Sequence, residues 1–567
     1  MAATNVFIRA PADRERQAAQ RLTRPHLITI QKGPRSGKDI SALARPLMLT
    51  LVMTLAGLCL SPSSATAANG PSIAVTNIHT FGINDGGRPR AGLILAPDGK
   101  LYGTTWTYGS TVLGGAVYQI DPSTNLLEIL HVFSPLDTNR RNADGFGPVA
   151  PLSLGPDGLL YGTTRQGGLA GPLPTSPGVG VLFQLDPADP ATFTTLHNFG
   201  TNEHYLDGAT PSGAPVSDGH GNYYGATNFG VIYKWDGSTV TTVHAFAPLK
   251  PDRTNFDGAN PYGSPVFGAD GRLYGMTVYG GTNGRGTVYS LDPVSKEFGV
   301  IHNFAPDPIS LTDNAPLQSL FLASDGALYG TNEYGGPNGT GFVFKVVGNE
   351  VINLHEFGRK SADTIPRFSN ADGSLPLSTL AEGVDGMIYG TTYYGGANGV
   401  GTIFRIAKDG TGFESLYSFL PGHDPVGTGS YPATGLVRMH DGSMFGTTFL
   451  GGIGYGVVYR LTLPPSVSIQ PAPITAIRMG RGILSRRASA VVLNGQAPYS
   501  YSWSIDFGAF MIHSPGAQDT SISAALAACD SAEGNLSVTV TDAAGRSASG
   551  STIINYKATR PVGGVCD

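Results

Sequence analysis

The chain has 567 residues, of which 79 are glycine and 41 proline, while 41% are hydrophobic and 9% aromatic. This apolar content can offset the cost of ordering the chain, which excludes a disordered protein, and glycine without a three-residue period indicates many tight turns. From residue 68 onward the chain carries 27 basic and 38 acidic residues, a net charge of −11, which argues against nucleic acid as a partner.

Residues 1–67 have the pattern of an export signal. The apolar run PLMLTLVMTLAGLCL follows Arg45, and the small residues Ala65-Thr66-Ala67 fit a signal-peptidase site. Fifteen apolar residues are few for a bilayer span, although an uncleaved membrane anchor remains the alternative. We therefore expect cleavage near Ala67 and a periplasmic, cell-surface or extracellular protein without a stable membrane span. The region before the run is long for a signal, which points to a true translation start further downstream.

A repeat with a period of 52 to 61 residues fills the middle of the chain. An Asp-Gly pair followed by a word like Leu-Tyr-Gly occurs seven times, at Asp98, Asp157, Asp218, Asp270, Asp325, Asp385 and Asp441. Each period contains four short apolar or alternating runs, such as PLQSLFLAS, ALYGTNEYG, GFVFKV and EVINLHEF in the fifth copy. Four strands per unit at this period predict an all-β fold, a seven-bladed β-propeller over residues 73–463.

Short words in each copy indicate how the strands end and how the copies join. The Asp-Gly pairs predict hairpin turns in which both central residues have positive φ. Proline after an aliphatic residue and aspartate predicts the end of a later strand at Pro122, Pro187 and Pro293. A His-x-Phe word recurs with its histidine at His79, His131, His197, His244, His302 and His355, and Tyr417 replaces it in the last copy. A histidine in six copies is better explained as a structural hydrogen-bonding group between neighbouring sheets than as a ligand or base.

The order of the runs predicts how the ring closes. The first His-x-Phe run, IAVTNIHTF at residues 73–81, precedes the first Asp-Gly pair, and none follows the seventh GVVYRLTL at residues 456–463. If the His-x-Phe run is the outer strand, the last blade lacks one. Residues 73–81 are therefore expected to supply it, which leaves no free sheet edge at the seam.

The repeated word DG-x-LYGTT-x-x-GG-x-x-G-x-GTVF resembles the tandem repeat of the bacterial GloVer-type choice-of-anchor proteins, over about residues 73–463. The resemblance implies an exported protein and no enzymatic activity, and it supplies no catalytic residues. Members differ mainly in how their C-termini attach them to a surface. The tail STIINYKATRPVGGVCD has neither an apolar span nor a sorting motif, which departs from that habit.

The C-terminal region predicts a second, smaller domain. Residues 464–473 are proline-rich and are expected to form a linker. Residues 474–567 show period-two alternation around a single Trp503, which predicts a small immunoglobulin-like β-sandwich. The domain also resembles PKD-like modules, although their usual word is reduced here to Asp506-Phe507-Gly508. Cys529 and Cys566 are expected to form one disulfide.

Function is sought where the copies differ, on the face that carries the glycine loops and the variable connections between blades. Aromatic residues before the glycine loops could stack on sugars or fill space between blades: Tyr108, Phe229, Tyr279, Tyr334 and Tyr394, with Trp106 and Tyr393 nearby. Polar candidates near the same channel mouth are Arg140, Arg141, Glu203, His204, Asp252, Arg253, Glu333, His423 and Asp424.

No phosphate loop, zinc-protease word, serine-nucleophile elbow or calcium loop occurs, so no metal, cofactor or catalytic residue is assigned. The expected function is that of an exported, non-catalytic, monomeric scaffold that binds glycan or extracellular protein. A secreted polysaccharide lyase or glycoside hydrolase, with carboxylates at the channel mouth, remains the alternative.

Overall fold

The protein is described by a computed structural model, in which residues 73–108, 114–169, 177–200, 205–305, 318–359, 369–422, 426–479, 482–495, 497–527 and 529–559 are placed. These residues form strands, turns and irregular segments and contain no α-helix. In particular, no described helical segment has the length and hydropathy that a bilayer crossing requires. The expected export segment, residues 1–67, lies outside the described residues.

The repeats form seven four-stranded antiparallel sheets within the described residues, which we number 1 to 7 in chain order. Sheet 1 contains β2 (Ile94–Leu95), β3 (Leu101–Thr105), β4 (Ala116–Asp121) and β5 (Leu126–Val132). Sheet 2 contains β7 (Ser153–Leu154), β8 (Leu160–Thr164), β10 (Val181–Asp186) and β11 (Asp189–Asn198). Sheet 3 contains β12 (Val216–Ser217), β13 (Tyr223–Thr227), β14 (Val231–Trp235) and β15 (Val240–Ala245). Sheet 4 contains β16 (Ala259–Phe267), β17 (Leu273–Tyr279), β18 (Thr287–Leu291) and β19 (Phe298–Asn303).

The remaining three sheets follow the same plan. Sheet 5 contains β20 (Phe321–Leu322), β21 (Leu328–Asn332), β22 (Phe342–Val347) and β23 (Glu350–Glu356). Sheet 6 contains β24 (Ala381–Glu382), β25 (Ile388–Thr392), β26 (Thr402–Ile406) and β27 (Glu414–Ser418). Sheet 7 contains β28 (Val437–Arg438), β29 (Met444–Thr448), β30 (Val457–Thr462) and β1 (Ala74–Thr80). In the connection from sheet 1 to sheet 2, β6 (Asn142–Phe146) pairs with β9 (Gln166–Gly168).

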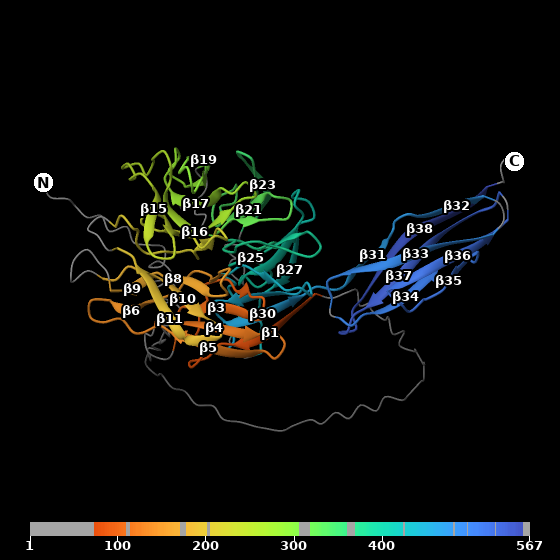
Figure 1. Ribbon diagram of the computed structural model, residues 1–567, viewed down its shortest axis with the longest axis horizontal. Helices are drawn as coiled ribbons and strands as arrows, with labels where there is room; N and C mark the ends of the chain where they lie inside the picture. The colour runs from red at the N-terminus through yellow and green to blue at the C-terminus, as the bar shows by residue number, and fades with distance from the viewer. Residues whose placement is uncertain are drawn as a thin grey trace, which may run out of the picture. The chain divides into compact units, whose positions relative to one another are not determined.

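The two ends of the repeat region meet in sheet 7, as the order of the runs predicts. Strand β1 pairs antiparallel with β30, from Ala74 opposite Thr462 to Thr80 opposite Val457 (Figure 1). The short inner strands of neighbouring sheets also adjoin, β12 with β16, β24 with β28, and β28 of sheet 7 with β2 of sheet 1. The sheets therefore follow one another in a closed series, and the fold is all-β and β-propeller-like.

Side-chain packing explains why the glycine and aromatic residues of the repeated motifs recur. In β17, Gly275 faces the ring of Tyr289 on β18, and a Cβ at Gly275 would lie 2.3 Å from the tyrosine oxygen. Both strands are largely buried, with Tyr289 1% exposed. Glycine in the second strand thus makes room for an aromatic ring from the third, and the other sheets repeat this packing with Tyr or Phe. The words encode the core of each sheet.

The Asp-Gly turns differ from the prediction in one respect. In the first, Gly99 has φ +82°, whereas Asp98 is not among the residues with positive φ, so one central residue adopts the left-handed conformation. The Asp98 carboxylate accepts hydrogen bonds from the Lys100 backbone N–H (3.0 Å) and the Tyr102 hydroxyl (2.7 Å). An aspartate that bonds its own turn and the next strand has no need of positive φ. The same aspartate–tyrosine contact occurs at Asp157–Tyr161, Asp270–Tyr274, Asp325–Tyr329 and Asp385–Tyr389.

The C-terminal strands form two further four-stranded sheets around one core. One has the order β31 (Ser466–Gln470), β33 (Gly482–Leu493), β36 (Asp519–Leu526), β35 (Phe510–Ile512). The other has the order β32 (Ile474–Met479), β38 (Ser547–Thr559), β37 (Ser531–Thr541), β34 (Ser500–Ile505). Trp503 is 5% exposed in their shared core and donates its indole N–H to the Ala517 carbonyl at 2.7 Å.

The prediction that residues 464–473 form a linker is wrong for residues 466–470. Residues 466–470 form β31, whose five residues pair in register with Ser489 to Leu493 of β33. The alternation of these five residues beside prolines is too short to distinguish a strand from a linker in the sequence alone. Cys529 is in a disulfide, and Cys566, its expected partner, lies outside the described residues.

Candidate binding face

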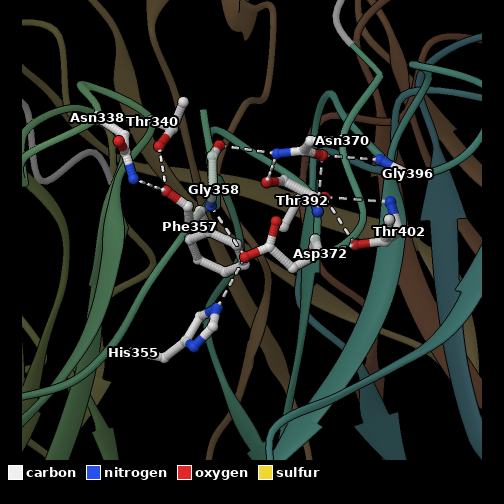
Figure 2. A network of polar contacts seen from close by, with 11 residues as sticks. Asn338, Thr340, His355, Phe357, Gly358, Asn370, Asp372, Thr392, Gly396 and Thr402 are labelled. Carbon is white, nitrogen blue, oxygen red and sulfur yellow. Dashed lines mark hydrogen bonds and ion pairs between the residues drawn. The ribbon is translucent and has the colours of Figure 1, made fainter. Parts of the chain in front are cut away.

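An asparagine motif joins the connections to the glycine loops. Each connection runs from the outer strand of one sheet to the inner strand of the next, and three carry the sequence Asn-x-Asp-Gly. Figure 2 shows the copy at residues 370–373. The Asn370 amide donates to the carbonyls of Gly358 (2.9 Å) and Gly373 (2.6 Å). Its oxygen accepts from the N–H groups of Gly373 (3.0 Å) and Gly396 (3.1 Å), so one side chain satisfies four backbone groups.

The same contacts recur in two other connections. Asn142 holds Gly168 at 3.1 Å and Asn255 holds Gly281 at 2.8 Å, each with the matching bonds inside its own connection. The connections and the glycine loops therefore share one face, as predicted, which we call the connection face. These asparagines are not among the predicted site residues, although the motif Asn-x-Asp-Gly, which begins at residues 142, 255 and 370, is present in the sequence.

The repeated histidine is structural, as predicted. His355 Nε2 lies 3.1 Å from Asp372, whose carboxylate also accepts from the Gly358 N–H at 2.9 Å (Figure 2). The imidazole stacks on Phe413 of the next sheet, with ring centroids 3.5 Å apart. His355 thus fixes its own sheet to the connection and to the following sheet. The connection after His302 lies largely outside the described residues. Equivalent pairs are His79–Asp85, His131–Asp144, His197–Asp207 and His244–Asp257.

The last copy exchanges both partners at once. Tyr417 takes the place of the histidine and Thr428 that of the aspartate, and their hydroxyls lie 2.7 Å apart. A neutral hydroxyl pair therefore replaces the histidine–carboxylate pair between sheets 6 and 7. The two substitutions preserve a contact, which supports a structural role for the whole series.

These pairs predict acid sensitivity. Burial alone would raise the pKa of Asp144, but hydrogen bonds from His131 and Ser134 outweigh it and hold that pKa below its ordinary value of 3.8. A carboxyl whose pKa is lower in the folded state stabilises the fold above its unfolded pKa, and this contribution is lost as pH falls through the folded value. We expect the melting temperature to fall below about pH 4. The curve of Asp144→Asn should be flatter between pH 5 and about 2.5, whereas that of the exposed Asp189→Asn should follow the parent; parallel curves for the parent and Asp144→Asn would contradict the assignment.

The aromatic candidates fall into different environments. Phe229 is 61% exposed, with its ring 5.6 Å from that of Tyr205. The guanidinium carbon of Arg253 lies over the ring of Tyr279, 5.8 Å from the ring centroid. Tyr108, Tyr334 and Tyr394 are half-buried. The repeated position therefore does not form one exposed aromatic ring around the face.

The polar candidates are dispersed. Arg140 is exposed and donates to Gln166 at 2.8 Å, while Arg141 is half-buried. Asp252 is exposed and accepts from the Thr254 hydroxyl at 2.7 Å. Glu333 is only 7% exposed, so its carboxylate is largely shielded from solvent. Glu203, His204, His423 and Asp424 lie outside the described residues.

A different set of residues comes together on the connection face. In each second strand, Tyr-Gly or Phe-Gly is followed by Thr-Thr or, in sheets 3, 4 and 5, by Ala-Thr, Met-Thr and Thr-Asn, and we call the next residue the position after Thr-Thr. In sheets 1 to 7 this residue is Trp106, Arg165, Asn228, Val278, Glu333, Tyr393 and Phe449. It lies beside the residue that precedes the connection proline, as in the Phe449 N–H bond to the Tyr431 carbonyl (3.0 Å). Aromatic residues occupy this position in sheets 6, 7 and 1, which are consecutive in the closed series. We call Tyr393, Phe449, Trp106 and Tyr431 the aromatic arc.

The arc is packed by direct ring contacts. The rings of Tyr393 and Tyr431 lie 5.2 Å apart, and Tyr394 lies 5.6 Å from Tyr431. The Arg90 guanidinium lies between Trp106 and Phe449, at 4.3 and 4.9 Å from their ring centroids. All four arc residues are half-buried, so they offer partial ring surface held by neighbours. Within the described part of the chain, no group of three or more His, Cys, Asp or Glu residues could hold a metal ion.

Several solved structures resemble the chain at low identity. The extracellular domain of a one-component system from B. thetaiotaomicron matches with a TM-score of 0.43 and 10% identity, over 87% of this chain and 58% of that chain. The GH74 xyloglucanase from Xanthomonas campestris matches with a TM-score of 0.42 and 14% identity, over 68% and 53%. A PL25 ulvan lyase matches with a TM-score of 0.41 and 14% identity, over 67% and 94%. The chain spans less than two thirds of the first of these structures.

Sequence comparison is more specific for the repeat itself. No curated protein sequence matches the chain. The model of the Gloeobacter/Verrucomicrobia repeat matches residues 66–255 and 249–366, together more than half of the chain. These residues include β1, the Asp-Gly turns and glycine loops of sheets 1 to 4, and the pairs His79–Asp85, His131–Asp144, His197–Asp207 and His244–Asp257. The chain therefore belongs to the Gloeobacter/Verrucomicrobia repeat family.

Proposed function

We propose that this protein is an exported, non-catalytic glycan-binding scaffold, and that the aromatic arc is its binding site. In this proposal the seven sheets are the blades of a β-propeller and the C-terminal strands form an immunoglobulin- or PKD-like spacer closed by a Cys529–Cys566 disulfide. Signal cleavage near Ala67 releases the protein to the periplasm, the cell surface or the medium. The protein acts as a monomer, without cofactor or nucleic acid.

One observation supports the choice of the aromatic arc as the binding site. The structural residues repeat around the ring, whereas aromatic side chains occupy the position after Thr-Thr in three consecutive sheets only. In the other four sheets this position holds Arg165, Asn228, Val278 and Glu333. Aromatic faces suit the apolar faces of sugar rings, and neighbouring rings on successive sheets suit successive sugars of a chain. Every aromatic residue of the arc comes from a rigid strand end or a hydrogen-bonded connection, which limits the entropy lost on binding.

The test is glycan binding by the chain from residue 68, followed on every bound glycan by an assay for released reducing sugar. We expect binding without release. Tyr393→Ala should weaken binding about tenfold, which corresponds to about 1.4 kcal/mol. Phe507→Ala serves as a matched control and should leave binding unchanged, because Phe507 is an aromatic residue between β34 and β35, 47% exposed.

Three outcomes would contradict the proposal in different ways. Release of sugar would overturn the non-catalytic assignment and favour the lyase or hydrolase alternative. Equal binding by the parent and Tyr393→Ala would move the site away from the arc. Absence of binding to any glycan would leave an extracellular protein as the better partner.

A further inference from the structure

Arginine is unevenly distributed on the connection face. We compare three positions in each copy: the residue before the connection proline, the residue after it, and the residue after Thr-Thr. Arginine occurs at only three of these positions in the described copies. Arg88 and Arg90 flank the proline before sheet 1, and Arg165 directly follows β8 of sheet 2. The other described copies have Gly147, Thr210, Asn260, Leu375 and Tyr431 before the proline, Val149, Ser212, Tyr262, Leu377 and Ala433 after it, and Trp106, Asn228, Val278, Glu333, Tyr393 and Phe449 after Thr-Thr.

The three arginines lie along one continuous stretch of this face. Arg88 and Arg90 share the ring of Phe449, at 5.9 and 4.9 Å from its centroid. Arg90 also stacks on Trp106, at 4.3 Å. A Cβ at the next pre-proline residue, Gly147, would lie 3.2 Å from the indole nitrogen of Trp106.

Arg165 adjoins this stack because its N–H donates to the Gly147 carbonyl at 3.3 Å. Arg88, Arg90 and Arg165 therefore follow one another across the face. The rings of Phe449 and Trp106 contact the first two, and the Gly147 backbone contacts the third. We call Arg88, Arg90, Trp106, Arg165 and Phe449 the arginine sector. It overlaps the aromatic arc at Trp106 and Phe449.

The sector offers hydrogen-bond donors to a ligand. Arg88 is exposed, and its side chain makes no hydrogen bond or ion pair with any described residue. Arg165 and Trp106 are half-buried, and the Arg165 side chain and the Trp106 indole N–H likewise make no hydrogen bond or ion pair with any described residue. Because the guanidinium of Arg90 is held between two rings, little side-chain entropy remains to be lost there on binding.

The chemistry of these groups selects the ligand. A guanidinium presents paired N–H donors that match the two oxygens of a carboxylate, or two oxygens of a sulfate. The chain from residue 68 is otherwise acidic, with 38 acidic and 27 basic residues, so three clustered arginines are a local exception. A neutral glycan needs no such cluster, whereas an acidic glycan would be repelled by the net negative charge of the chain and attracted to the sector.

We propose that the arginine sector binds the anionic groups of an acidic polysaccharide, so that the scaffold recognises chains whose sugars carry carboxylates or sulfates. This inference rests on the proposed glycan-binding function and names its substrate class. The rings of Phe449 and Trp106 hold the sugar faces, while Arg88 and Arg165 bind the acidic substituents at the two ends of the sector. Arg90 keeps the two rings apart and adds positive charge between them.

The experiment measures binding of four probes to the chain from residue 68 at 50 and 300 mM salt. The probes are a galacturonate hexamer, a sulfated carrageenan hexamer, and two neutral hexamers, one of glucose and one of xylose. We expect at least one acidic hexamer to bind, with affinity that falls as salt rises. Arg88→Ala and Arg165→Ala should each weaken that binding about tenfold and reduce its dependence on salt. Which acidic hexamer binds decides between carboxylate and sulfate.

Arg487→Ala is the matched control, since Arg487 is exposed on β33 of the C-terminal sheets, and it should bind like the parent. Melting temperatures of all variants show that a loss of binding is not a loss of fold. Unchanged binding of the acidic hexamer by both Arg88→Ala and Arg165→Ala overturns the inference. So does binding of neutral hexamers only, which leaves the proposed function standing. Absence of binding by all four probes and by the wider glycan set overturns the proposed function as well.

Discussion

A chain that begins at residue 81, without β1, is expected to unfold roughly 10 °C below the chain that begins at residue 68. Sheet 7 would lose its outer strand and the six register pairs from Ala74–Thr462 to Thr80–Val457. Removing the seven-residue edge strand β1 should lower the free energy of unfolding by about 4 kcal/mol or more. The uncovered edge of β30 should also pair with other chains, so the truncated protein should associate as its concentration rises.

The matched control is a chain that begins at residue 73 and keeps β1 complete. It should melt with the parent and remain monomeric at the same concentrations. Differential scanning calorimetry gives the melting temperatures, and light scattering gives the mass. If the chain without β1 melted with the parent and stayed monomeric, the pairing of β1 with β30 would contribute nothing to the fold.

The second large effect is expected for Asn370→Ala, which should destabilise the protein by about 2 to 4 kcal/mol. Alanine removes four hydrogen bonds at once and leaves the carbonyls of Gly358 and Gly373 and the N–H groups of Gly373 and Gly396 without the Asn370 side chain as a partner (Figure 2). A partly buried polar group that loses its partner costs more than the bond itself contributes. Chemical denaturation monitored by tryptophan fluorescence measures the change.

Two further variants complete this test. Asn139→Ala changes an exposed asparagine in another connection and should alter stability by less than about 0.5 kcal/mol. Asn370→Asp keeps the accepting oxygen but loses both donors, so it should fall between Asn139→Ala and Asn370→Ala. A stability of Asn370→Ala equal to that of Asn139→Ala would show that water replaces the side chain at no cost.

Much of the fold follows from the sequence because each repeated word serves contacts within one sheet. Gly275 and Tyr289 recur as Gly446 and Tyr459, so the local pairing of second and third strands is repeated in the chain itself. The closing role of β1 was also predictable, since the count of outer runs leaves sheet 7 one strand short. The β31 strand could not be predicted because its alternation covers only five residues beside prolines.

The candidate site was less accessible to sequence reasoning. Repetition revealed the histidines, but the asparagine motif is complete in only three connections and was overlooked. The aromatic candidates were grouped by their place before the glycine loops, whereas contacts form one or two residues earlier, at Trp106 and Phe449. Arg90 and Phe449 meet only because sheet 7 adjoins sheet 1, and no local pattern places residues 359 positions apart within 4.9 Å. Charge clustering across that seam depends on the closed ring.

The pairing of β1 with β30 also bears on the order of events during synthesis. Strand β1 leaves the ribosome first, but its partner begins only at Val457. At the usual rate of translation, β1 waits roughly 20 to 80 s before the rest of sheet 7 exists. During that interval the nascent chain can hold completed sheets but cannot close them into a ring. A chain built in this way stays open until its last repeat is made.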